Sequence, residues 1–524
     1  NDVHGGNDVI DGGSNGLNYI FGGVGDDTIT GGTAGKNVLF GDNAVAVFEI
    51  LVPTTFNLSS PVPLVRNSDG SWSKNSDTQP GRQPRTLTPF HSRHLWSTDP
   101  ANGGQDTIFG GRNDDIIVGG SMHDFTTPNT QNLGNFLQGN RGNDIIVGTN
   151  AYIQRSADRS VLRIETIFER YGSNDRINVA EGLRPEASRG QNILIGGTGD
   201  DIIHGGWENN PQTIIGDNAV VVRADGTAYA NDIWTQHPEW GGSDILIGGP
   251  ANDIIIGGTG GNDNTNVPNL HGSYTVGGGQ LQATITGHGM VVNQVGYFEF
   301  TSGEANDGLY RVLAVNNNTI TLGAINWVGM DLPTMTSASS NGSVILRRGG
   351  DVISGGRGDD HLMGDGAYIE RDANDTILRI RSMDPSYGGN DLIDLFGNMG
   401  NDVIIGGHGD DIIYGGTMDD GRDLIFGGWA LIDYTSFRNV SVDVTLPGER
   451  ILFANAMATD PLYGGNNWID GGTGANLISG GPGNNYVTHS IAEMMNRVRG
   501  RPGSKGMVTA NGNYVTKQSA GVYS

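Results

Sequence analysis

The sequence predicts an all-β protein whose main body is a parallel β-roll, a solenoid of short strands, with β-hairpin excursions and one small inserted β domain. Three observations predict this fold. A nine-residue unit rich in Gly and Asp returns many times in one register, and paired runs of alternating apolar and polar residues follow several blocks of it. Glycine also accounts for 87 of the 524 residues, far above its share in ordinary globular proteins.

The repeated unit has the form G-G-x-G-x-D-x-U-x, in which U is a large aliphatic residue. Residues 22–30 (Gly-Gly-Val-Gly-Asp-Asp-Thr-Ile-Thr) form one full copy, and residues 196–204 and 355–363 form two more. Near-copies occupy residues 110–118, 139–147, 248–256 and 397–405. The glycines allow turns with φ > 0, and the aliphatic residue is expected to point into the roll and stack on its equivalents.

The Asp at the sixth position of the unit predicts a metal site. Carboxylates and exposed carbonyls are the hard oxygen ligands that Ca²⁺ prefers, whereas Mg²⁺ demands a more rigid octahedral site. The predicted metal-binding residues of full turns are Asp27, Asp115, Asp144, Asp201, Asp253, Asp360, Asp402 and Asp411, with the turn glycines Gly23, Gly25, Gly197, Gly199, Gly356 and Gly358. Those of shortened turns are Asp8, Asp106, Asp175, Asp244 and Asp391.

Other interpretations remain open at single positions in this register. Asp is a common turn residue, so any one of these aspartates can serve turn geometry alone. Asn18, Asn37 and Asn192 offer only a neutral oxygen, and we expect them to bind the ion more weakly. In the last roll turns the residues that stand where Asp is usual are Asn467, Asn476 and Asn485.

On these repeats the chain resembles the RTX, or haemolysin-type calcium-binding, family, over roughly half to two-thirds of its residues. The resemblance implies a secreted protein that folds on Ca²⁺, from a Gram-negative-type bacterium or a cyanobacterium, usually exported through a one-step secretion channel. It also implies ions held between successive turns, with Asp side chains and turn carbonyls sharing the coordination. Giant bacterial adhesins and S-layer proteins show a similar arrangement of repeats.

The composition agrees with folding that depends on cations. Hydrophobic residues make up only 36% of the chain and the formal net charge is −26, so the free chain is expected to be largely disordered without counter-ions. Each site at 100 times its Kd adds about 2.7 kcal/mol, so we expect the chain to be unfolded at cytosolic calcium and to fold outside the cell. The acidity also argues against a nucleic-acid partner, which needs a basic surface.

Several sequence features are missing. The chain has no cysteine, which excludes disulfides, thiolate metal sites and a Cys nucleophile. No apolar run approaches the length of a membrane span, and no N-terminal signal peptide is visible. Because the chain begins at Asn1 inside a repeat, we expect it to be part of a longer polypeptide.

A second periodicity lies above the nonapeptides. Roll blocks end in a related tetrad at residues 41–44, 148–151, 216–219 and 364–367, and each tetrad leads into an alternating run. In residues 367–371 and 376–380 two such runs flank a polar turn, which is typical of a β-hairpin. The roll then restarts at Gly-Gly-x-Asp or a close variant, several times after a lead-in that contains Pro.

These periods divide the chain into seven predicted segments. They are a first roll block (1–47), an excursion with an insertion rich in Pro, Ser and Arg (48–101), roll modules with hairpin flaps (102–261), an inserted all-β domain (262–348), another roll module (349–428), a degenerate excursion with terminal roll turns (429–487) and a basic C-terminal segment (488–524). In the inserted domain the expected strands are 274–276, 280–285, 289–295, 297–300, 309–315 and 319–322. Residues 480–524 resemble a piece of acetyl-CoA acetyltransferase-like thiolases, but with no Cys nucleophile no catalytic role is carried over.

The sequence favours a structural protein over an enzyme. It contains neither His-Glu-x-x-His nor Gly-x-Ser-x-Gly, and His91 and His94, although spaced like a metal pair, lie in a predicted loop where histidines are usually solvated. We expect a calcium-dependent extracellular structural protein that self-associates into a surface layer, fibril or matrix filament, because a solenoid has open ends.

Two alternatives stay open. The chain can be a calcium-stabilised adhesin whose inserted domain binds a protein, a cell-surface glycan or lipopolysaccharide through Tyr297, Phe298, Phe300 or Trp327, which otherwise are core residues. It can also be the non-catalytic repeat portion of a secreted enzyme or toxin.

Overall fold

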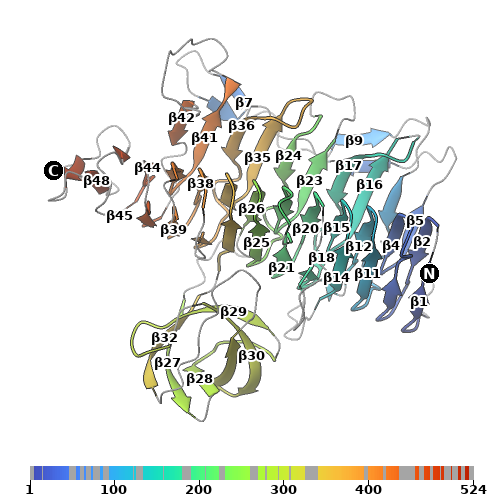
Figure 1. Ribbon diagram of the computed structural model, residues 1–524, viewed down its shortest axis with the longest axis horizontal. Helices are drawn as coiled ribbons and strands as arrows, with labels where there is room; N and C mark the ends of the chain where they lie inside the picture. Colours follow the sequence, from blue (N-terminus) through green and yellow to red (C-terminus); the bar gives the residue numbers. More distant parts are fainter. Residues whose placement is uncertain are drawn as a thin grey trace.

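A computed structural model of the chain shows a long solenoid with a barrel at its side (Figure 1). The structure describes residues 5–46, 94–124, 134–179, 190–259, 269–324, 340–394, 399–435, 455–458 and 465–488, with seven short strands elsewhere. Gaps within these ranges fall at residues 15, 122, 157, 207, 224–229, 278–279, 293, 306–307, 348, 417–420, 473–475 and 484. The described residues contain no helix that is long and apolar enough to cross a membrane.

Two parallel sheets form the solenoid, because the chain alternates between them at each nine-residue unit. In spatial order, sheet A consists of β1 (Val9–Asp11), β3 (Thr28–Thr30), β11 (Thr107–Gly111), β14 (Phe136–Asn140), β19 (Arg176–Ile177), β21 (Ile202–His204), β25 (Ile245–Gly249), β33 (Val352–Gly356), β37 (Leu392–Ile393), β39 (Ile412–Tyr414), β43 (Trp468–Asp470) and β45 (Tyr486–Thr488). Sheet B consists of β2 (Asn18–Phe21), β4 (Asn37–Phe40), β12 (Ile116–Val118), β15 (Ile145–Val147), β20 (Ile193–Ile195), β22 (Thr213–Ile215), β26 (Ile254–Gly258), β34 (His361–Asp365), β38 (Val403–Ile405), β40 (Leu424–Phe426), β44 (Leu477–Ser479) and β46 (Arg497–Val498).

The core between sheets A and B is a single file of aliphatic side chains. The U residue of each unit points inward, as Ile203 does from β21 and Ile214 from β22, and both are 0% exposed. Each strand therefore contributes one large side chain to this core, and its flanking residues face outward. A core this narrow leaves the turns on both edges of the roll close to the apolar interior.

The hairpin excursions pair with one another to form a third layer, sheet C. Its antiparallel order is β42 (Asn455–Ala458), β41 (Ala430–Asp433), β36 (Ile377–Ser382), β35 (Ala367–Arg371), β24 (Ile233–Thr235), β23 (Ala219–Val222), β17 (Val161–Thr166), β16 (Ala151–Arg155), β10 (Leu95–Ser97) and β5 (Ala44–Ala46). Sheet C covers the outer face of sheet B and is the upper layer in Figure 1.

A second apolar core lies between sheets B and C. Val118 and Val147 on the outer face of sheet B cluster with Ile153 and Ile164 of sheet C, and all four are buried. Strands of sheet B such as β12 are therefore apolar at every position, whereas β3 in sheet A alternates Thr-Ile-Thr. This is the pattern of a sheet covered on both faces next to one that is partly open to solvent.

The inserted segment forms a closed antiparallel barrel between β26 and β33. In spatial order its strands are β27 (Leu270–Gly277), β28 (Gln280–Ile285), β31 (Thr319–Ala324), β30 (Gly308–Asn316), β29 (Val295–Glu299) and β32 (Ser340–Leu346). Aromatic rings fill its centre, with Tyr274 and Phe300 packed edge to face at a centroid distance of 4.8 Å and Phe298 completely buried.

The barrel packs directly against the outer face of sheet A. Tyr297 of β29 belongs to one apolar cluster with Ile245, Ile247, Val352 and Leu392 of the solenoid. Figure 1 shows the barrel below β25 and β21, on the side opposite to sheet C. The cluster explains why these strands of sheet A carry aliphatic residues at outward positions, where β3 carries threonine.

The remaining strands are short. They pair as β6 (Thr55–Leu58) with β9 (Gln83–Thr86), β7 (Leu64–Arg66) with β8 (Trp72–Lys74), β13 (His123–Asp124) with β18 (Tyr171–Gly172), and β47 (Lys505–Val508) with β48 (Tyr514–Lys517). Apart from these strands, the insertion predicted at 53–90, His91 and most of the thiolase-like segment lie outside the described residues.

The predicted fold class, a parallel β-roll with hairpin excursions and one small β domain, is confirmed. The predicted hairpin at 367–380 is β35 and β36, paired from Ala367 with Ser382 to Arg371 with Ile377. Residues 429–434, where a degenerate hairpin was expected, contain β41, and β42 completes that hairpin.

One predicted strand in the barrel is wrong, and another was missed. The described residues of 289–294 are largely irregular and the strand begins only at Val295, because Gly287 and Gly289 adopt positive φ and His288 Nδ1 accepts the N–H of Met290. Strand β32 was not predicted, because Gly342 and the serines at its start hide its alternation.

Truncating a side chain of the single-file core should destabilise the solenoid far more than truncating its neighbour. We expect Leu137→Ala in β14, which removes a completely buried side chain, to lower the free energy of unfolding by about 2–5 kcal/mol in the presence of calcium. Denaturant unfolding measures this value. The matched control is Gln138→Ala, whose partly exposed side chain faces away from this core and should change stability by less than about 1 kcal/mol.

Candidate metal centre

The sixth-position residues form a continuous hydrogen-bond ladder along one edge of the roll, in the turns that lead into sheet A. The backbone N–H of Asp201 donates to Oδ1 of Asp244 at 2.7 Å, and that of Asp244 donates to Oδ1 of Asp351 at 2.7 Å. This A-edge ladder runs through Asp8, Asp27, Asp106, Asn135, Asp175, Asp201, Asp244, Asp351, Asp391, Asp411, Asn467 and Asn485.

An equivalent ladder follows the opposite edge, in the turns that lead into sheet B. This B-edge ladder runs through Asn37, Asp115, Asp144, Asn192, Gln212, Asp253, Asp360, Asp402, Asp423 and Asn476. Asn18 joins it through its side chain, whose Nδ2 donates to Oδ1 of Asn37 at 2.8 Å. One oxygen of each ladder side chain from Asp115 onward is thus committed to the backbone of a neighbouring turn.

The second carboxylate oxygen of most ladder aspartates is buried and accepts no hydrogen bond from any described residue. These Oδ2 atoms belong to Asp27, Asp106, Asp144, Asp175, Asp201, Asp244, Asp253, Asp351, Asp360, Asp391 and Asp411. A buried carboxylate oxygen without a donor is strongly unfavourable unless a cation or a proton neutralises it. The same unbonded carboxylate oxygen in so many equivalent turns indicates one shared kind of ligand.

A backbone carbonyl approaches each of these oxygens on the A edge. At Gly406, the first glycine of its unit, the position of a Cβ atom would lie 2.5 Å from Asp411 Oδ2 and 2.7 Å from the carbonyl oxygen of Gly427 in the next turn. Two oxygens therefore face one point at about the 2.3–2.6 Å distance of a Ca²⁺ ligand. The first glycine is required because any side chain would fill this space.

The donor set fits Ca²⁺. It combines one carboxylate oxygen with backbone carbonyls, and no group of three or more His, Cys, Asp or Glu side chains converges as a ligand set among the described residues. In each of these A-edge Asp rungs the carboxylate and the carbonyl of the next glycine would hold the ion between turns. The ion would supply the positive charge that these facing oxygens require. The turns of this chain set the distance between the carboxylate oxygen and the carbonyl oxygen.

The glycines predicted from the repeat have the conformations that the turns need. Gly23, Gly25, Gly197, Gly199, Gly356 and Gly358 all have positive φ. Sequence reasoning missed the first glycine of each unit, which is Gly22, Gly196 or Gly355 in the three full copies. A Cβ atom at any of these positions would meet Oδ2 of the sixth-position Asp.

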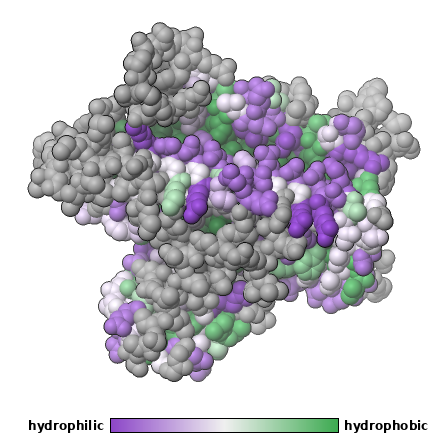
Figure 2. Space-filling view, viewed as in Figure 1, coloured by the Kyte–Doolittle hydropathy of each residue, from purple (hydrophilic) through white to green (hydrophobic). Residues whose placement is uncertain are grey.

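A second ladder lies outside the first, at the fifth position of the unit. The backbone N–H of Gln105 donates to Oδ1 of Asp26 at 2.9 Å, and that of Asn466 donates to Oδ1 of Asp410 at 2.6 Å. In this outer ladder the later turn donates to the earlier one, whereas in the sixth-position ladders the earlier turn donates. Its residues are exposed, and hydrophilic residues predominate on the solenoid face seen in Figure 2.

The tetrad aspartates join the excursions to the roll. Asp217 accepts the N–H of Gly242 at 2.8 Å, in the turn where the roll restarts, and the N–H of Thr259 at 2.6 Å. Asp42 and Asp365 make the corresponding bonds in their modules. Both oxygens of these carboxylates are occupied by donors, so the tetrad Asp positions the restart of the roll.

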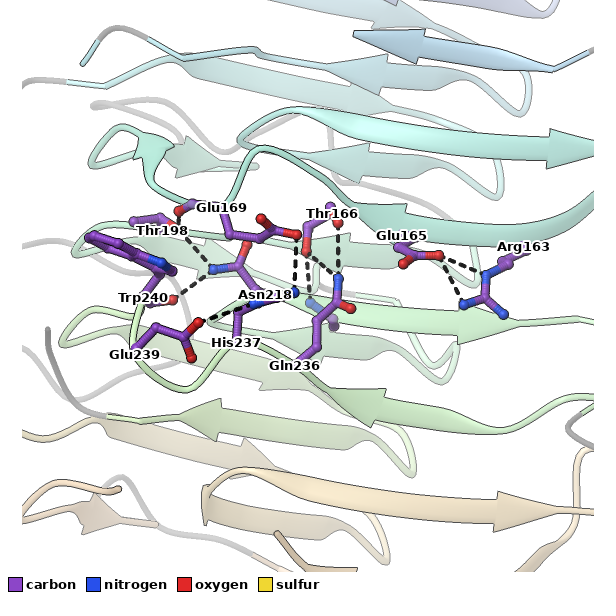
Figure 3. Close-up of polar contacts among 11 residues, drawn as sticks. Arg163, Glu165, Thr166, Glu169, Thr198, Asn218, Gln236, His237, Glu239 and Trp240 are labelled. Atoms are coloured by element: carbon purple, nitrogen blue, oxygen red, sulfur yellow. Dashed lines mark hydrogen bonds and ion pairs between the residues drawn. The ribbon is translucent and has the colours of Figure 1, made fainter. Parts of the chain in front are cut away.

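The lead-in that contains Pro closes the same junction (Figure 3). Asn218 donates through Nδ2 to Thr198 Oγ1 at 2.8 Å and to the carbonyl of Trp240 at 2.7 Å. His237 lies between Glu169 and Glu239, each 3.2 Å from a ring nitrogen. These contacts tie one hairpin to the next.

His94 is buried against Tyr152, and burial lowers its pKa to about 4. It is therefore a core residue rather than a solvated one.

Burial raises the pKa of the ladder carboxyls, because a desolvated carboxylate is disfavoured. The pKa is raised to about 8 at Asp144 and Asp253, and to about 9 at Asp106, where the Asp42 carboxylate adds to the effect of burial. At Asp201 burial and the neighbouring Asp175 raise the pKa well above 3.8. Either a proton or a metal cation must therefore accompany these carboxyls when the roll is folded.

All thirteen predicted aspartates lie on the two ladders. They divide between the edges, Asp115, Asp144, Asp253, Asp360 and Asp402 on the B edge and the others on the A edge. Asp8 is exposed at the first rung, and Asp115 Oδ2 already accepts the N–H of Gly111 at 2.5 Å.

Sequence reasoning missed four ladder positions. These are Asn135, Gln212, Asp351 and Asp423. Asp351 follows Gly349-Gly350, a restart without a preceding hairpin, and the Leu or Ile two positions after each missed position was the available signal.

The metal-free chain should fold in acid and unfold as the pH rises. The folded carboxyls bind protons more tightly than the unfolded ones, whose pKa is 3.8, so the stability they contribute is complete below that pH and is lost as the pH rises through about 7 to 9. Far-UV circular dichroism of calcium-free protein should show β structure near pH 4 and lose most of it by pH 8, while millimolar calcium retains it at pH 8. A β signal at pH 8 that is indifferent to chelator contradicts this assignment.

Filling one ion position should remove one site. In Gly196→Ala the new methyl group would lie closer than 3.0 Å to Asp201 Oδ2 and to the carbonyl oxygen of Gly216. We expect a loss of about 2 kcal/mol or more in calcium, from overpacking and the lost ion together. Calcium titration followed by denaturant unfolding measures both effects. The control, Gly277→Ala in the barrel, meets nothing within 4 Å and should change neither.

Comparison with known families agrees with this geometry. The family model of the RTX calcium-binding nonapeptide repeat (4 copies) matches residues 12–43, 101–125, 132–150, 186–210, 241–263, 345–367, 387–417 and 463–490. A search of curated proteins found no match. The matched blocks are the segments of the solenoid between the hairpins of sheet C, and proteins with these repeats are typically secreted or extracellular. The solenoid of this chain is therefore built from RTX calcium-binding nonapeptide repeats, which bind Ca²⁺ at multiple sites.

Proposed function

We propose that this calcium-binding β-roll protein has a structural role, assembling outside the cell with copies of itself into a fibril, surface layer or matrix filament. One observation carries the proposal. Sheets A, B and C run along the same axis in the same direction, so β1, β2 and β5 lie at one end of the molecule and β45, β46 and β42 at the other. A stack of three sheets that ends together offers a shared surface for the next molecule.

The ladders favour head-to-tail stacking. In each sixth-position pair the earlier rung donates its backbone N–H to the side-chain oxygen of the later rung. The first A-edge rung therefore ends in the exposed carboxylate of Asp8, and the last ends in the backbone of Asn485. A second copy placed in the same direction would continue the ladder, whereas a copy placed in reverse would oppose like groups.

The barrel lies away from these ends. It packs on the outer face of sheet A through Tyr297, beside β25, β33 and β37 in the middle of the sheet. A projection at the side of each molecule suits a filament or layer whose units stack through their ends.

The adhesin alternative loses its sequence support in the described part of the barrel. Phe298 and Phe300 lie in the barrel core and Tyr297 lies at the contact with sheet A, so none of the three offers an open ring for a glycan. Trp327 lies outside the described residues. No catalytic role is proposed for the chain.

Calcium should convert soluble chains into ordered polymers. We expect analytical ultracentrifugation to show monomers in chelator and large assemblies in millimolar calcium, and electron microscopy to show regular filaments or sheets. Val9→Lys adds a charge to the exposed edge strand β1 and should suppress assembly without changing the circular dichroism spectrum in calcium.

The matched control is Val292→Lys, at an exposed position of the barrel away from both ends, which should assemble as the parent chain does. Folded monomers at every calcium concentration would contradict the structural proposal. Glycan or cell binding by those monomers would favour an adhesin.

A further inference from the structure

The two ladders contain rungs of two chemical kinds at equivalent places. In Asp rungs a carboxylate oxygen faces the carbonyl oxygen of the next glycine. In the rungs with a side-chain amide, the nitrogen occupies that place: the Cβ position of Gly427 would lie 2.7 Å from Asn467 Nδ2 and 2.9 Å from the Gly480 carbonyl oxygen. Asn467 Nδ2 donates to the carbonyls of Gly427 at 2.6 Å and of Gly480 at 3.2 Å.

The orientation of this amide follows from its neighbours. Oδ1 of Asn467 accepts the backbone N–H of Asp411 at 2.8 Å, so the nitrogen must be the atom that faces the carbonyls. The reverse orientation would bring N–H against N–H and oxygen against oxygen. The carbonyls that would bind an ion in an Asp rung are thus hydrogen-bonded within the chain.

Side-chain amides bond turn carbonyls in other amide rungs as well, although at Gln212 the Cγ atom rather than the nitrogen lies at the position of the first-glycine Cβ. Asn37 Nδ2 donates to the carbonyls of Gly32 and Gly35, both at 3.1 Å, and Gln212 Nε2 donates to those of Asn210 at 2.6 Å and Gly190 at 2.9 Å. Further donors to turn carbonyls are the side-chain amides of Asn135, Asn476 and Asn485. A neutral amide also removes the ligand charge on which calcium affinity depends.

We propose that the amide rungs bind no calcium, because the side-chain nitrogen takes the place of the ion, and that the last rungs of the solenoid therefore stay wound without it. All ladder residues beyond Asp411 on the A edge and Asp423 on the B edge carry amides, namely Asn467, Asn485 and Asn476. Elsewhere amide rungs are interspersed with Asp rungs. The sequence predicted weaker calcium binding at Asn18, Asn37 and Asn192. For Asn37 the proposal is that no calcium binds. The inference does not depend on self-assembly.

Hydrogen exchange of the whole chain tests the distribution. After removal of calcium at pH 8, amides in residues 465–488 should remain protected, while those in residues 241–257 and 349–365, where both edges carry Asp, should exchange as in an unfolded chain. Restored calcium should protect all three segments. Equal loss of protection in all three segments, or protection of 349–365 but not of 465–488, overturns the proposal.

Exchanging the two side chains at adjacent rungs gives a second test. Asp411→Asn should lower the number of bound ions measured by native mass spectrometry by at least one and extend protection in chelator to residues 406–414. Asn467→Asp should do the opposite, adding an ion in calcium and losing protection at 465–488 in chelator.

The control is Asp410→Asn, which makes the same change of charge at the exposed fifth position, and it should alter neither readout. Should Asp411→Asn fail to fold, Asn467→Asp alone decides: an unchanged ion count with unchanged protection refutes the proposal. Indistinguishable results for Asp411→Asn and Asp410→Asn refute it as well.

Discussion

In successive turns of this solenoid, a carboxylate oxygen faces a carbonyl oxygen, and the fold depends on neutralising that pair. Two apolar cores hold the three sheets together, but neither can form until the turns bring the strands into register. The turns do so by committing one oxygen of each ladder side chain to the backbone of the adjacent rung, which leaves the other oxygen against a carbonyl. Folding is thereby coupled to whatever neutralises that oxygen, and the fold, its stability and its response to the environment share one origin.

Much of this arrangement could be predicted from the sequence because it is local. The nonapeptide fixes which residue turns, which points inward and which carries the carboxylate, and each of these follows from spacing alone. The position of Asp351 or Gln212 on a ladder could not be predicted in the same way. Their turns depart from the repeat, and hydrogen bonds place them on the ladders: Asp351 pairs with Asp244 and Gln212 pairs with Asp253. Likewise the register of the amide in Asn467 is set by neighbours 56 and 13 residues away.

The layering is encoded in a subtler pattern. The outer face of sheet B is largely apolar because sheet C covers it, and the outer face of sheet A carries the aliphatic residues Ile245, Ile247, Val352 and Leu392 beneath the barrel. The apolar residues in the outward positions were visible in the sequence, but their partners were not. The sequence of a single hairpin does not predict its edge-to-edge pairing with another hairpin, because those contacts join residues of different modules.

The barrel shows how such a solenoid acquires new parts. Its first and last strands pair with each other, Leu270 opposite Leu346, so the chain leaves the roll and returns to it at nearly the same place. Across this detour Asp253 still donates to Asp360, 107 residues later, as if the two turns were consecutive. The segment between two rungs is therefore a site where an insertion is tolerated. Any module whose ends meet can be grafted there without loss of continuity, which makes the scaffold open to enlargement by recombination and to deliberate display of foreign domains.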